Sequence, residues 1–530
     1  MSTLDNDDYT GGQLKDELLP SGQKGHSHKA HQLSLIITAL SNFSVQYNFQ
    51  AIAVALMVMS ASVCTNNDDE CKENEQASWV SGAATSTVFI GCIAGQLSMG
   101  IIGDIVGRNI AMCITLSIAA LGALGSALCS YGKPEEIYIM IITCRFILGI
   151  GAGGVYPLSA TKAAEDASKG GPSSGKVNPV AAGKAFFWQA PGAMTPWVVG
   201  YILSYWDTSA EAKWRLLLGL GFLPASLVVV LTVMEMRLRD NETKSAMREE
   251  SNSLFHDTER DVDNTLAEGT VNAQTAIAEA AQRRKDEMLS DPHYRMQLLV
   301  TSGCWFIYDV AFYGVALFGG DIVNAMKTSD DDNVSSDPAI RYAASQEMLA
   351  LAMGIPASIM TIYWMKTFGS KNAQVYGFIF QGVCFFMLSV AFYPLMKSQP
   401  GVLLGLYCLL LFSLNSGPSM TTFCLPAETF PMEIRTTFNG ISAASGKLGA
   451  AVGAYMFGPV AAATSFPSVM ILCGALCLLG SLISYMYIED QDINAGTGTG
   501  AGAGGYQQLE RTVREDEDDE DLMRVRYLSR

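Results

Sequence analysis

The chain has few charged residues for its length. Of its 530 residues, 16% are Asp, Glu, Lys or Arg and 49% are hydrophobic, whereas an ordinary soluble domain has about 25% charged residues. Basic residues are especially scarce, since 34 Lys and Arg stand against 51 Asp and Glu. Nucleic acid binding rests on Lys and Arg that neutralise phosphates, so the net charge of -17 argues against nucleic acid as a partner. The shortage of charge favours a membrane protein.

Residue types used for catalysis and metal binding are also sparse. The five histidines lie in polar segments without a nucleophile–base set, so we expect neither an enzyme nor a cofactor or metal. Ten of the twelve cysteines lie in apolar runs, where a free Cys acts as a small hydrophobe. Cys64 and Cys71 flank an acidic loop and either form a disulfide in an oxidising space or remain two loop thiols. The first thirty residues are polar, so no signal peptide is expected.

Long apolar runs are abundant. A helix that crosses a bilayer needs about 20 predominantly apolar residues. Twelve runs meet this requirement: 33–60, 77–101, 110–131, 137–161, 181–205, 214–235, 296–321, 343–365, 373–396, 401–424, 437–461 and 466–488. We therefore predict an all-α integral membrane protein with twelve transmembrane helices in two six-helix halves. The predicted parts are an N-terminal tail (1–32), a first half (33–235), a central loop (236–294), a second half (295–488) and a Gly-rich, acidic, disordered tail (489–530).

The orientation follows from basic residues and loop chemistry. With both termini and the central loop cytoplasmic, 25 of the 34 Lys and Arg lie on the cytoplasmic side, although the short loops alone are nearly balanced, with eight inside and seven outside. The same orientation places the Cys64/Cys71 loop and the "NVS" sequon at Asn333 outside. Arg145 and Lys447 fall well inside their spans, away from both ends.

Two motifs link these spans to a known superfamily. "GIIGDIVGRN" (100–109) follows the second span, and "RFILGIGAGG" (145–154) lies in the fourth. Both resemble signatures of the major facilitator superfamily, which implies two helical halves around a central site. The resemblance makes Gly100, Asp104, Gly107 and Arg108 a gate motif, in which Asp104 serves a helix N-terminus or a cation across the gate.

Three further stretches resemble the phosphate:proton symporter family. They are "GAGGVYPLSAT" (151–161), "GCWFIYDVAFYG" (303–314) and "PAETFPMEIRTTFNGISAASGKLGA" (426–450). The resemblance implies a secondary transporter whose anionic substrate is inorganic phosphate or a close phosphate-bearing anion, with a proton as the second partner. It also assigns substrate-binding residues: Trp305, Asp309, Tyr313, Lys447, Gln189, Tyr156 and, where the family has asparagine, Ser419.

The residues themselves are compatible with these roles. Trp305, Asp309 and Tyr313 are spaced by four, so they share one face of a helix. A charge at the bilayer centre costs about 2.5–3.5 kcal/mol, so it should face a cavity or a partner. Asp309 can neutralise Lys447 in an empty site and take a proton when a dianion arrives; the alternative is a structural ion pair.

Three further charged residues have less defined roles. Arg145 is either a coupling residue, like Asp309, or a structural bond to neighbouring backbone. Glu428 and Arg435 fall at the cytoplasmic edge of the tenth and eleventh spans, so we expect them to act as gate residues.

The chain departs from the family at several acids. In "FSVQYNFQ" (43–50), Val45 and Asn48 stand where the family has aspartates, and Val155 replaces an acid in the fourth span. Coupling would then rest on Asp309 alone, or the protein is a uniporter or exchanger. The first span also carries Asn42, Gln46 and Gln50 at intervals of four, suited either to a ligand or to hydrogen bonds between helices.

Other functions stay open from the sequence. A carrier of sugar or another organic solute would suit the neutral first span, and a nutrient sensor without transport is a third alternative. The expected location is the plasma membrane, in contact with lipid. "YQQL" (506–509) and "DDEDLM" (518–523) have the form of sorting signals, which would bring adaptors to the tail and place the protein in an endosomal or vacuolar membrane.

Overall fold

The computed structural model describes residues 21–63, 78–128, 131–168, 178–255, 282–316 and 336–489. Every regular element within these ranges is an α-helix. The Cys64/Cys71 loop, the Asn333 sequon and the C-terminal tail with its sorting signals lie outside them.

The N-terminal half consists of eight helices in the described ranges. They are α2 (Ser21–Val63), α4 (Ser78–Val106), α5 (Arg108–Leu128), α6 (Pro134–Ser168), α7 (Pro179–Phe187), α8 (Gln189–Leu203), α9 (Ala210–Leu220) and α10 (Phe222–Phe255). Within this half α6 packs against α4 and α5, and α2 packs against α8 and α10.

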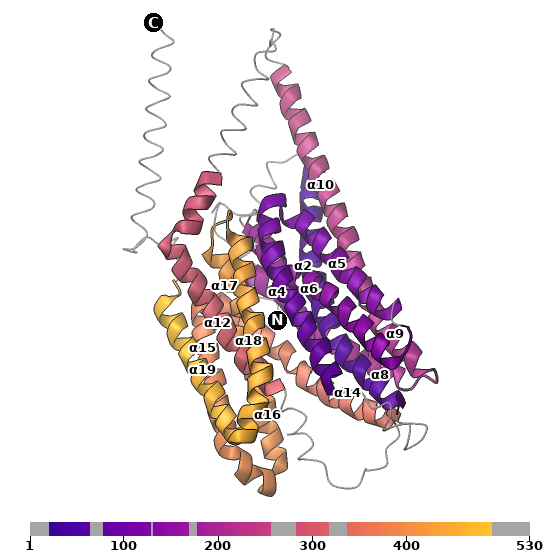
Figure 1. The fold of residues 1–530 in the computed structure, drawn as a ribbon. Coiled ribbons are helices and arrows are strands. Elements are labelled where there is room, and N and C mark those ends of the chain that lie inside the picture. Colours follow the sequence, from indigo (N-terminus) through magenta and orange to yellow (C-terminus); the bar gives the residue numbers. More distant parts are fainter. Residues whose placement is uncertain are drawn as a thin grey trace. The chain divides into compact units, whose positions relative to one another are not determined.

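The C-terminal half follows the same plan. Its described helices are α12 (Pro292–Ala316), α14 (Ser336–Ala352), α15 (Gly354–Ser398), α16 (Pro400–Leu414), α17 (Pro418–Thr429), α18 (Arg435–Ala463) and α19 (Phe466–Tyr487). Here α12 packs against α18, and α15 packs against α16 and α19. The two halves meet mainly where α4 contacts α18 and where α8 contacts α14 (Figure 1).

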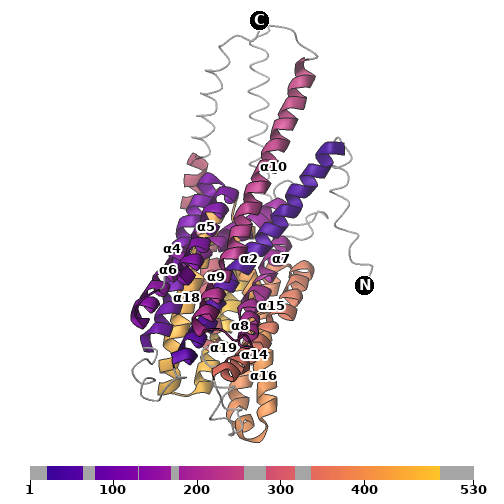
Figure 2. The ribbon, with the colours of Figure 1, turned by 90° about the vertical axis from the view of Figure 1, so that its right-hand side faces the viewer.

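One helix is much longer than its predicted span. The sixth span was expected to end at 235, but α10 continues to Phe255 through residues predicted to be central loop, and it projects past its neighbours (Figure 2). The extension is rich in helix-favouring residues. It also carries the ion pairs Glu235–Arg239 and Asp240–Lys244 at i, i+4, with N–O distances of 2.7 and 2.6 Å. These features stabilise the helix beyond the predicted end of the span.

Glycines and caps mark the helix ends. Gly107, between α4 and α5, has φ 90°, and Gly369, at a kink inside α15, has φ 82°. Both lie in the left-handed region that only glycine adopts easily. They therefore turn the chain at corresponding places of the two halves. At the start of α7, the Asn178 side chain accepts a hydrogen bond from the Val180 amide.

The helices suit a lipid environment. Eight helical stretches of the described chain are long and apolar enough to cross a membrane. Large apolar side chains also lie on the outer faces, for example Val390, which is 80% exposed, and Leu299, which is 69% exposed. The helix α2 is absent from the eight, because Ser, Thr, Asn and Gln side chains on it are buried against other helices and lower its hydropathy.

Glycines allow close packing inside the N-terminal half. A Cβ atom at Gly91 would overlap the carbonyl oxygen of Phe146, and one at Gly149 would overlap that of Val88. Small residues let transmembrane helices approach closely in the absence of a hydrophobic driving force between them. The pairing of α4 with α6 places Phe89 and Tyr156 toward the interface between the halves, where the candidate site lies.

Candidate substrate site

A lysine and an aspartate meet inside the bundle. Lys447 on α18 and Asp309 on α12 are 4% and 3% exposed. Their Nζ and Oδ2 atoms are 3.4 Å apart, and Lys447 Nζ also donates to the Tyr313 hydroxyl at 3.4 Å. The structure thus brings together three of the residues that the sequence predicts for the site.

Aromatic rings surround the lysine from both halves. Lys447 Nζ lies 5.7 Å from the ring centre of Phe89 on α4, 5.3 Å from that of Tyr156 on α6 and 5.2 Å from that of Tyr313. At these distances the ring quadrupoles attract a cation. The rings attract the ammonium group through their faces and do not occupy its hydrogen-bond donors, of which two are directed to Asp309 and Tyr313.

Trp305 lies beside the aromatic rings that surround Lys447. Its ring meets that of Tyr156 edge-on, with centroids 6.4 Å apart. The ring packs on Gly446, where a Cβ atom would lie 2.6 Å from the indole nitrogen. Beyond Tyr156 the next ring is Phe423 of α17 at 6.3 Å, and Ser419 is buried one turn before it. Ser419 therefore lies on the same side of α17 as the residue that packs on Tyr156.

Amide side chains continue the site into the N-terminal half. Gln46 on α2 donates to the Tyr156 hydroxyl at 3.2 Å and to Gln189 Oε1 at 2.8 Å. Gln189 on α8 in turn donates to Asn42 at 2.8 Å. Gln50 accepts from the indole of Trp197 at 3.2 Å. The polar stripe of the first span thus forms hydrogen bonds between helices, which was one of its two predicted uses.

Arg145 lies apart from the Lys447–Asp309 pair. It is 1% exposed, and its guanidinium donates to the backbone carbonyl of Asn48 on α2. Its Nε atom has no partner, and no acid in the described ranges lies within ion-pair distance. The bond to backbone matches the structural alternative for Arg145, and its charge has no counter-charge among these residues.

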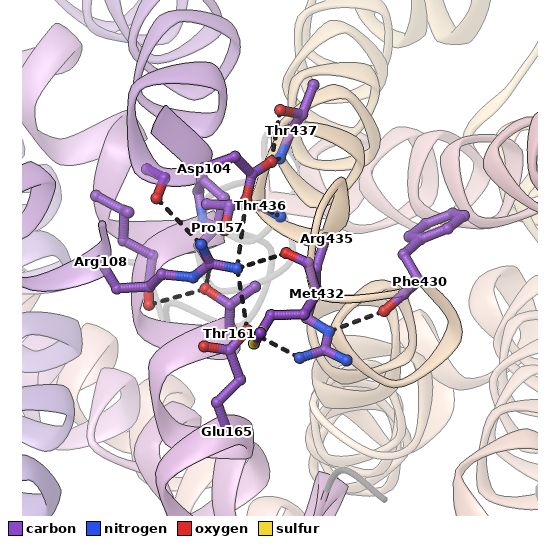
Figure 3. Close-up of polar contacts among 12 residues, drawn as sticks. Asp104, Arg108, Pro157, Thr161, Glu165, Phe430, Met432, Arg435, Thr436 and Thr437 are labelled. Carbon is purple, nitrogen blue, oxygen red and sulfur yellow. Dashed lines mark hydrogen bonds and ion pairs between the residues drawn. The ribbon is translucent and has the colours of Figure 1, made fainter. Parts of the chain in front are cut away.

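The gate motif bridges the two halves. Asp104, near the end of α4, accepts from the backbone amides of Thr436 and Thr437 at 3.2 and 2.8 Å, and from the Thr437 hydroxyl at 2.6 Å. These amides belong to the first turn of α18, where N–H groups have no partner within the helix. The same carboxylate lies 3.3 Å from NH2 of Arg108, four residues further along the chain, so Asp104 contacts a helix N-terminus of the other half and a cation of its own half (Figure 3).

Glu165 joins two arginines of this gate. Its Oε1 atom lies 3.1 Å from Arg108 NH2 and 2.8 Å from Arg435 NH1 of the other half. Arg108 also donates to the carbonyl of Met432 at 2.8 Å, and Arg435 donates to that of Phe430 at 2.8 Å (Figure 3). We name Asp104, Arg108, Glu165 and Arg435 the gate cluster.

Two further residues predicted for the gate, Gly100 and Glu428, are not among these four. Gly100 lets α4 approach α18 closely, because a Cβ atom there would lie 2.8 Å from the Thr436 carbonyl oxygen. Glu428 lies on α17 beside Ser370 of α15 and is not part of the gate cluster. Glu165 was missed from the sequence, although the polar run "TKAAED" (161–166) at the end of an apolar span is a usable signal.

A second group of buried charges was also missed. Lys162 on α6 lies 2.8 Å from Glu235 of α10 and 3.3 Å from Asp166, and Arg239 lies 3.1 Å from Asp166. Lys162 and Glu235 are 3% and 0% exposed. These pairs tie α6 to α10 within the N-terminal half.

The family model described as "Sugar (and other) transporter" matches residues 34–490. The chain belongs to this family of major facilitator superfamily transporters, as the gate motif indicated. It is therefore a multi-pass membrane transport protein, and the family is one of transporters rather than enzymes.

Curated relatives include phosphate transporters. The inorganic phosphate transporter PT2 of Toxoplasma gondii is 30% identical over 478 residues, which cover 90% of this chain and 76% of the relative. The probable inorganic phosphate transporter 1-7 of Arabidopsis thaliana is 29% identical over 457 residues, 81% of this chain and 82% of the relative. These relatives agree with the phosphate branch and do not favour the sugar alternative.

Solved structures share the fold. The proton:xylose symporter XylE bound to 6-bromo-6-deoxy-D-glucose aligns with a TM-score of 0.64 at 17% identity, covering 87% of this chain and 97% of that one. The inward-open form of XylE from E. coli aligns with a TM-score of 0.55 at 16% identity, covering 88% and 97%. The all-helical fold of the superfamily is thereby confirmed.

Proposed function

We propose that this protein transports inorganic phosphate, or a close phosphate-bearing anion, at the Lys447–Asp309 site. The observation that carries this proposal is the buried Lys447, which lies 3.4 Å from the single carboxylate that contacts it among the described residues and is surrounded by aromatic rings from both halves. A buried charge needs a partner. A cation that faces the interface between the two halves, with one carboxylate beside it, can take an anionic ligand as an additional partner.

The surroundings of Lys447 match an oxyanion. Its ammonium group has three donors, and the hydroxyls of Tyr156 and Tyr313 add donors from two helices. Trp305, Gln189 and Ser419 complete the substrate-binding set in this proposal. A tetrahedral phosphate has four oxygens to distribute among such donors and brings negative charge to the ammonium group, whereas a neutral sugar brings none.

Asp309 acts as the proton-binding group in this proposal. In the empty site it neutralises Lys447 across 3.4 Å. When HPO4²⁻ arrives, the carboxylate would lie close to a second and stronger anion, which favours its protonation. Phosphate and one proton then occupy the site together.

The proposed transport cycle is alternating access between two six-helix halves. The twelve crossings are α2, α4, α5, α6, α7 with α8, α9 with α10, α12, α14 with α15 to Gly369, the rest of α15, α16 with α17, α18 and α19. With cytoplasmic termini, the gate cluster closes the cytoplasmic end, and opening would break its bonds between α6 and α18. The plasma membrane is the proposed location, with an endosomal or vacuolar membrane as the alternative.

Uptake of labelled phosphate into proteoliposomes tests this function. The purified protein should accumulate phosphate. Asp309→Asn should reduce initial uptake at least tenfold, because the site loses both its proton acceptor and the negative charge that neutralises Lys447. Asp240→Asn is a matched control, since it makes the same change in an exposed pair with Lys244 and should leave uptake intact. Absence of phosphate uptake by the folded wild-type protein would contradict the proposal and direct the assay to organic solutes.

A further inference from the structure

Two buried amides lie at the contact between the halves. Gln96 on α4 and Asn439 on α18 are both 0% exposed, and no N or O atom of either amide group has a hydrogen-bond partner among the described residues. The Thr436 hydroxyl, one turn before Asn439, is also buried without a partner among these residues. The large majority of buried polar side-chain atoms in proteins are hydrogen-bonded. Packing alone therefore does not explain why three polar side chains occupy this contact.

The backbones of the two halves touch at the same place. A Cβ atom at Gly440, the residue after Asn439, would overlap the carbonyl oxygen of Gln96. One at Gly100 would lie 2.8 Å from the carbonyl oxygen of Thr436. Gln96 thus comes from one half, and Asn439 and Thr436 come from the other. Separation of α4 from α18 therefore opens the contact at which all three residues lie.

This contact lies between the Lys447–Asp309 site and the gate cluster. On α4, Gln96 lies seven residues after Phe89, whose ring contacts Lys447, and eight residues before Asp104 of the gate cluster. On α18, Asn439 lies eight residues before Lys447, which is about 12 Å along the helix axis. Spacings of seven and eight keep residues on one face of a helix. An anion that leaves Lys447 toward the gate cluster would therefore pass this part of the contact.

We propose that Gln96, Asn439 and Thr436 form a second phosphate subsite, which the anion occupies between Lys447 and the gate end once α4 and α18 separate. This inference rests on the proposed function. With the gate cluster closed, the three side chains are enclosed in the contact without partners among the described residues. With it open, they line the path of the anion and donate hydrogen bonds to it.

The chemistry of the three side chains suits an anion in passage. Each amide offers two N–H donors and the hydroxyl offers one. None of the three carries a negative charge that would repel phosphate, and none carries a positive charge that would hold it as strongly as Lys447 does. Rapid passage of an ion requires sites that bind it well enough to admit it and weakly enough to release it. A neutral subsite beside a cationic one meets both conditions.

The competing explanation is that the amides only weaken the closed contact. Gln96→Glu separates the two explanations, because it adds a charge at nearly constant shape. In a phosphate subsite the carboxylate repels the anion, so the affinity for phosphate that arrives from the gate end falls. If the amides affect closure alone, a buried carboxylate without a partner destabilises the closed contact. The gate end is then open for more of the time, and the apparent affinity from that end rises.

The test compares phosphate uptake from the two sides of the membrane. Inside-out and right-side-out vesicles are prepared from cells that express the full-length protein, and uptake by vesicles from cells that lack it is subtracted. In the proposed orientation, inside-out vesicles present the gate end to labelled phosphate. We expect Gln96→Glu to raise the KM in inside-out vesicles about tenfold and to change the KM in right-side-out vesicles much less. An unchanged or lower KM in inside-out vesicles overturns the subsite.

Asn372→Asp is the matched control on α15. It also turns an amide into a carboxylate, but the Asn372 amide donates to the Phe368 carbonyl of its own helix at 2.9 Å. Its KM should equal that of the wild type from both sides. A rise in KM for this variant as large as that for Gln96→Glu would assign the effect to added negative charge in general and would overturn the subsite.

Two further variants test the other half. Asn439→Asp should raise the KM in inside-out vesicles as Gln96→Glu does. Thr436→Val removes a donor without adding charge and should raise this KM about threefold. If neither acidic variant folds, Thr436→Val decides, and a KM equal to that of the wild type overturns the subsite. Absence of phosphate uptake by wild-type vesicles of both orientations refutes the proposed function instead.

Discussion

Trp305 reaches the lysine site because the residue beside Lys447 is a glycine. A Cβ atom at Gly446 would lie 2.4 Å from one indole carbon and 2.6 Å from the indole nitrogen. The absence of a side chain lets the indole pack on α18 next to the ammonium group. At the residue scale the site thus depends on a small residue as well as on the charged pair.

This packing predicts the effect of Gly446→Ala. The methyl group should push Trp305 away from Tyr156 and weaken phosphate binding, which we expect as a KM about tenfold higher with little change in the amount of folded protein. Gly303→Ala on α12 is the matched control, because a Cβ atom there meets nothing within 4 Å. Equal KM values for the two variants would contradict a role for Trp305 in the site. Labelled phosphate uptake at several concentrations measures the difference.

Glycine contacts also decide how the helices pack. At Gly151 on α6 a Cβ atom would lie 2.6 Å from the backbone oxygen of Thr115 and 2.7 Å from the Cα atom of Ala119 on α5. Backbone atoms cannot move aside as a flexible side chain can. At the element scale, the contact between α5 and α6 therefore tolerates no larger residue.

We expect Gly151→Val to destabilise the protein. Overpacking of a well-packed core typically costs about 1–3 kcal/mol, so the melting temperature in detergent should fall by several degrees. Gly405→Val on α16 introduces the same side chain where nothing lies within 4 Å, and it should change the melting temperature much less. Fluorescence-detected size exclusion after heating measures both variants. If Gly405→Val lowered the melting temperature as much as Gly151→Val, the destabilisation would come from helix propensity and not from the contact with α5.

The contact between the halves combines favourable and unfavourable polar groups. The gate cluster supplies ion pairs and bonds to the start of α18. Close to it, Gln96 on α4 and Asn439 on α18 are both 0% exposed, and their amide atoms have no partner among the described protein atoms. A buried polar group without a partner costs about 1–3 kcal/mol. At the scale of the whole molecule, the contact at this end thus balances stabilising and destabilising polar groups, which suits the proposed opening of the gate.

This balance predicts that Glu165→Gln favours opening of the gate end. Losing the charge that joins Arg108 and Arg435 should cost about 1.4 kcal/mol or more, a factor of ten in a two-state equilibrium. Thr436→Cys, at a position that is 0% exposed, reports the opening through its rate of reaction with a permeant thiol reagent. We expect that rate to rise about tenfold with Glu165→Gln. Glu211→Gln, which removes a partly exposed pair with Arg215, should leave the rate unchanged.

Much of the fold could be predicted from the sequence. Apolar runs long enough to cross a bilayer must form helices, since every backbone group needs a partner inside lipid. The helices accordingly lie close to the predicted spans, for example α18 at Arg435–Ala463 for the span 437–461. The end of α10 was not predicted, because a polar loop and a projecting polar helix can have the same amino-acid composition.

The candidate site, like the fold, could be predicted only in part from the sequence. Residues on one helix were grouped by spacing alone, as with Trp305, Asp309 and Tyr313, because a period near four places them on one face. The approach of Lys447 to Asp309 was inferred only from a family resemblance. The bond of Glu165 to Arg108 and Arg435, between residues 57 and 270 positions apart, had no local signal.

The sequence by itself determined that the chain is a helical membrane protein with charged residues inside its spans, because hydropathy and charge act locally along the chain. Only the tertiary structure decided which of these charges have partners. Lys447 meets Asp309, Lys162 meets Glu235 and Asp166, and Arg145 meets only backbone among the described residues. The reason is physical: the helix patterns are insensitive to which helices become neighbours, whereas an ion pair depends on a few ångströms between helices that are distant in sequence.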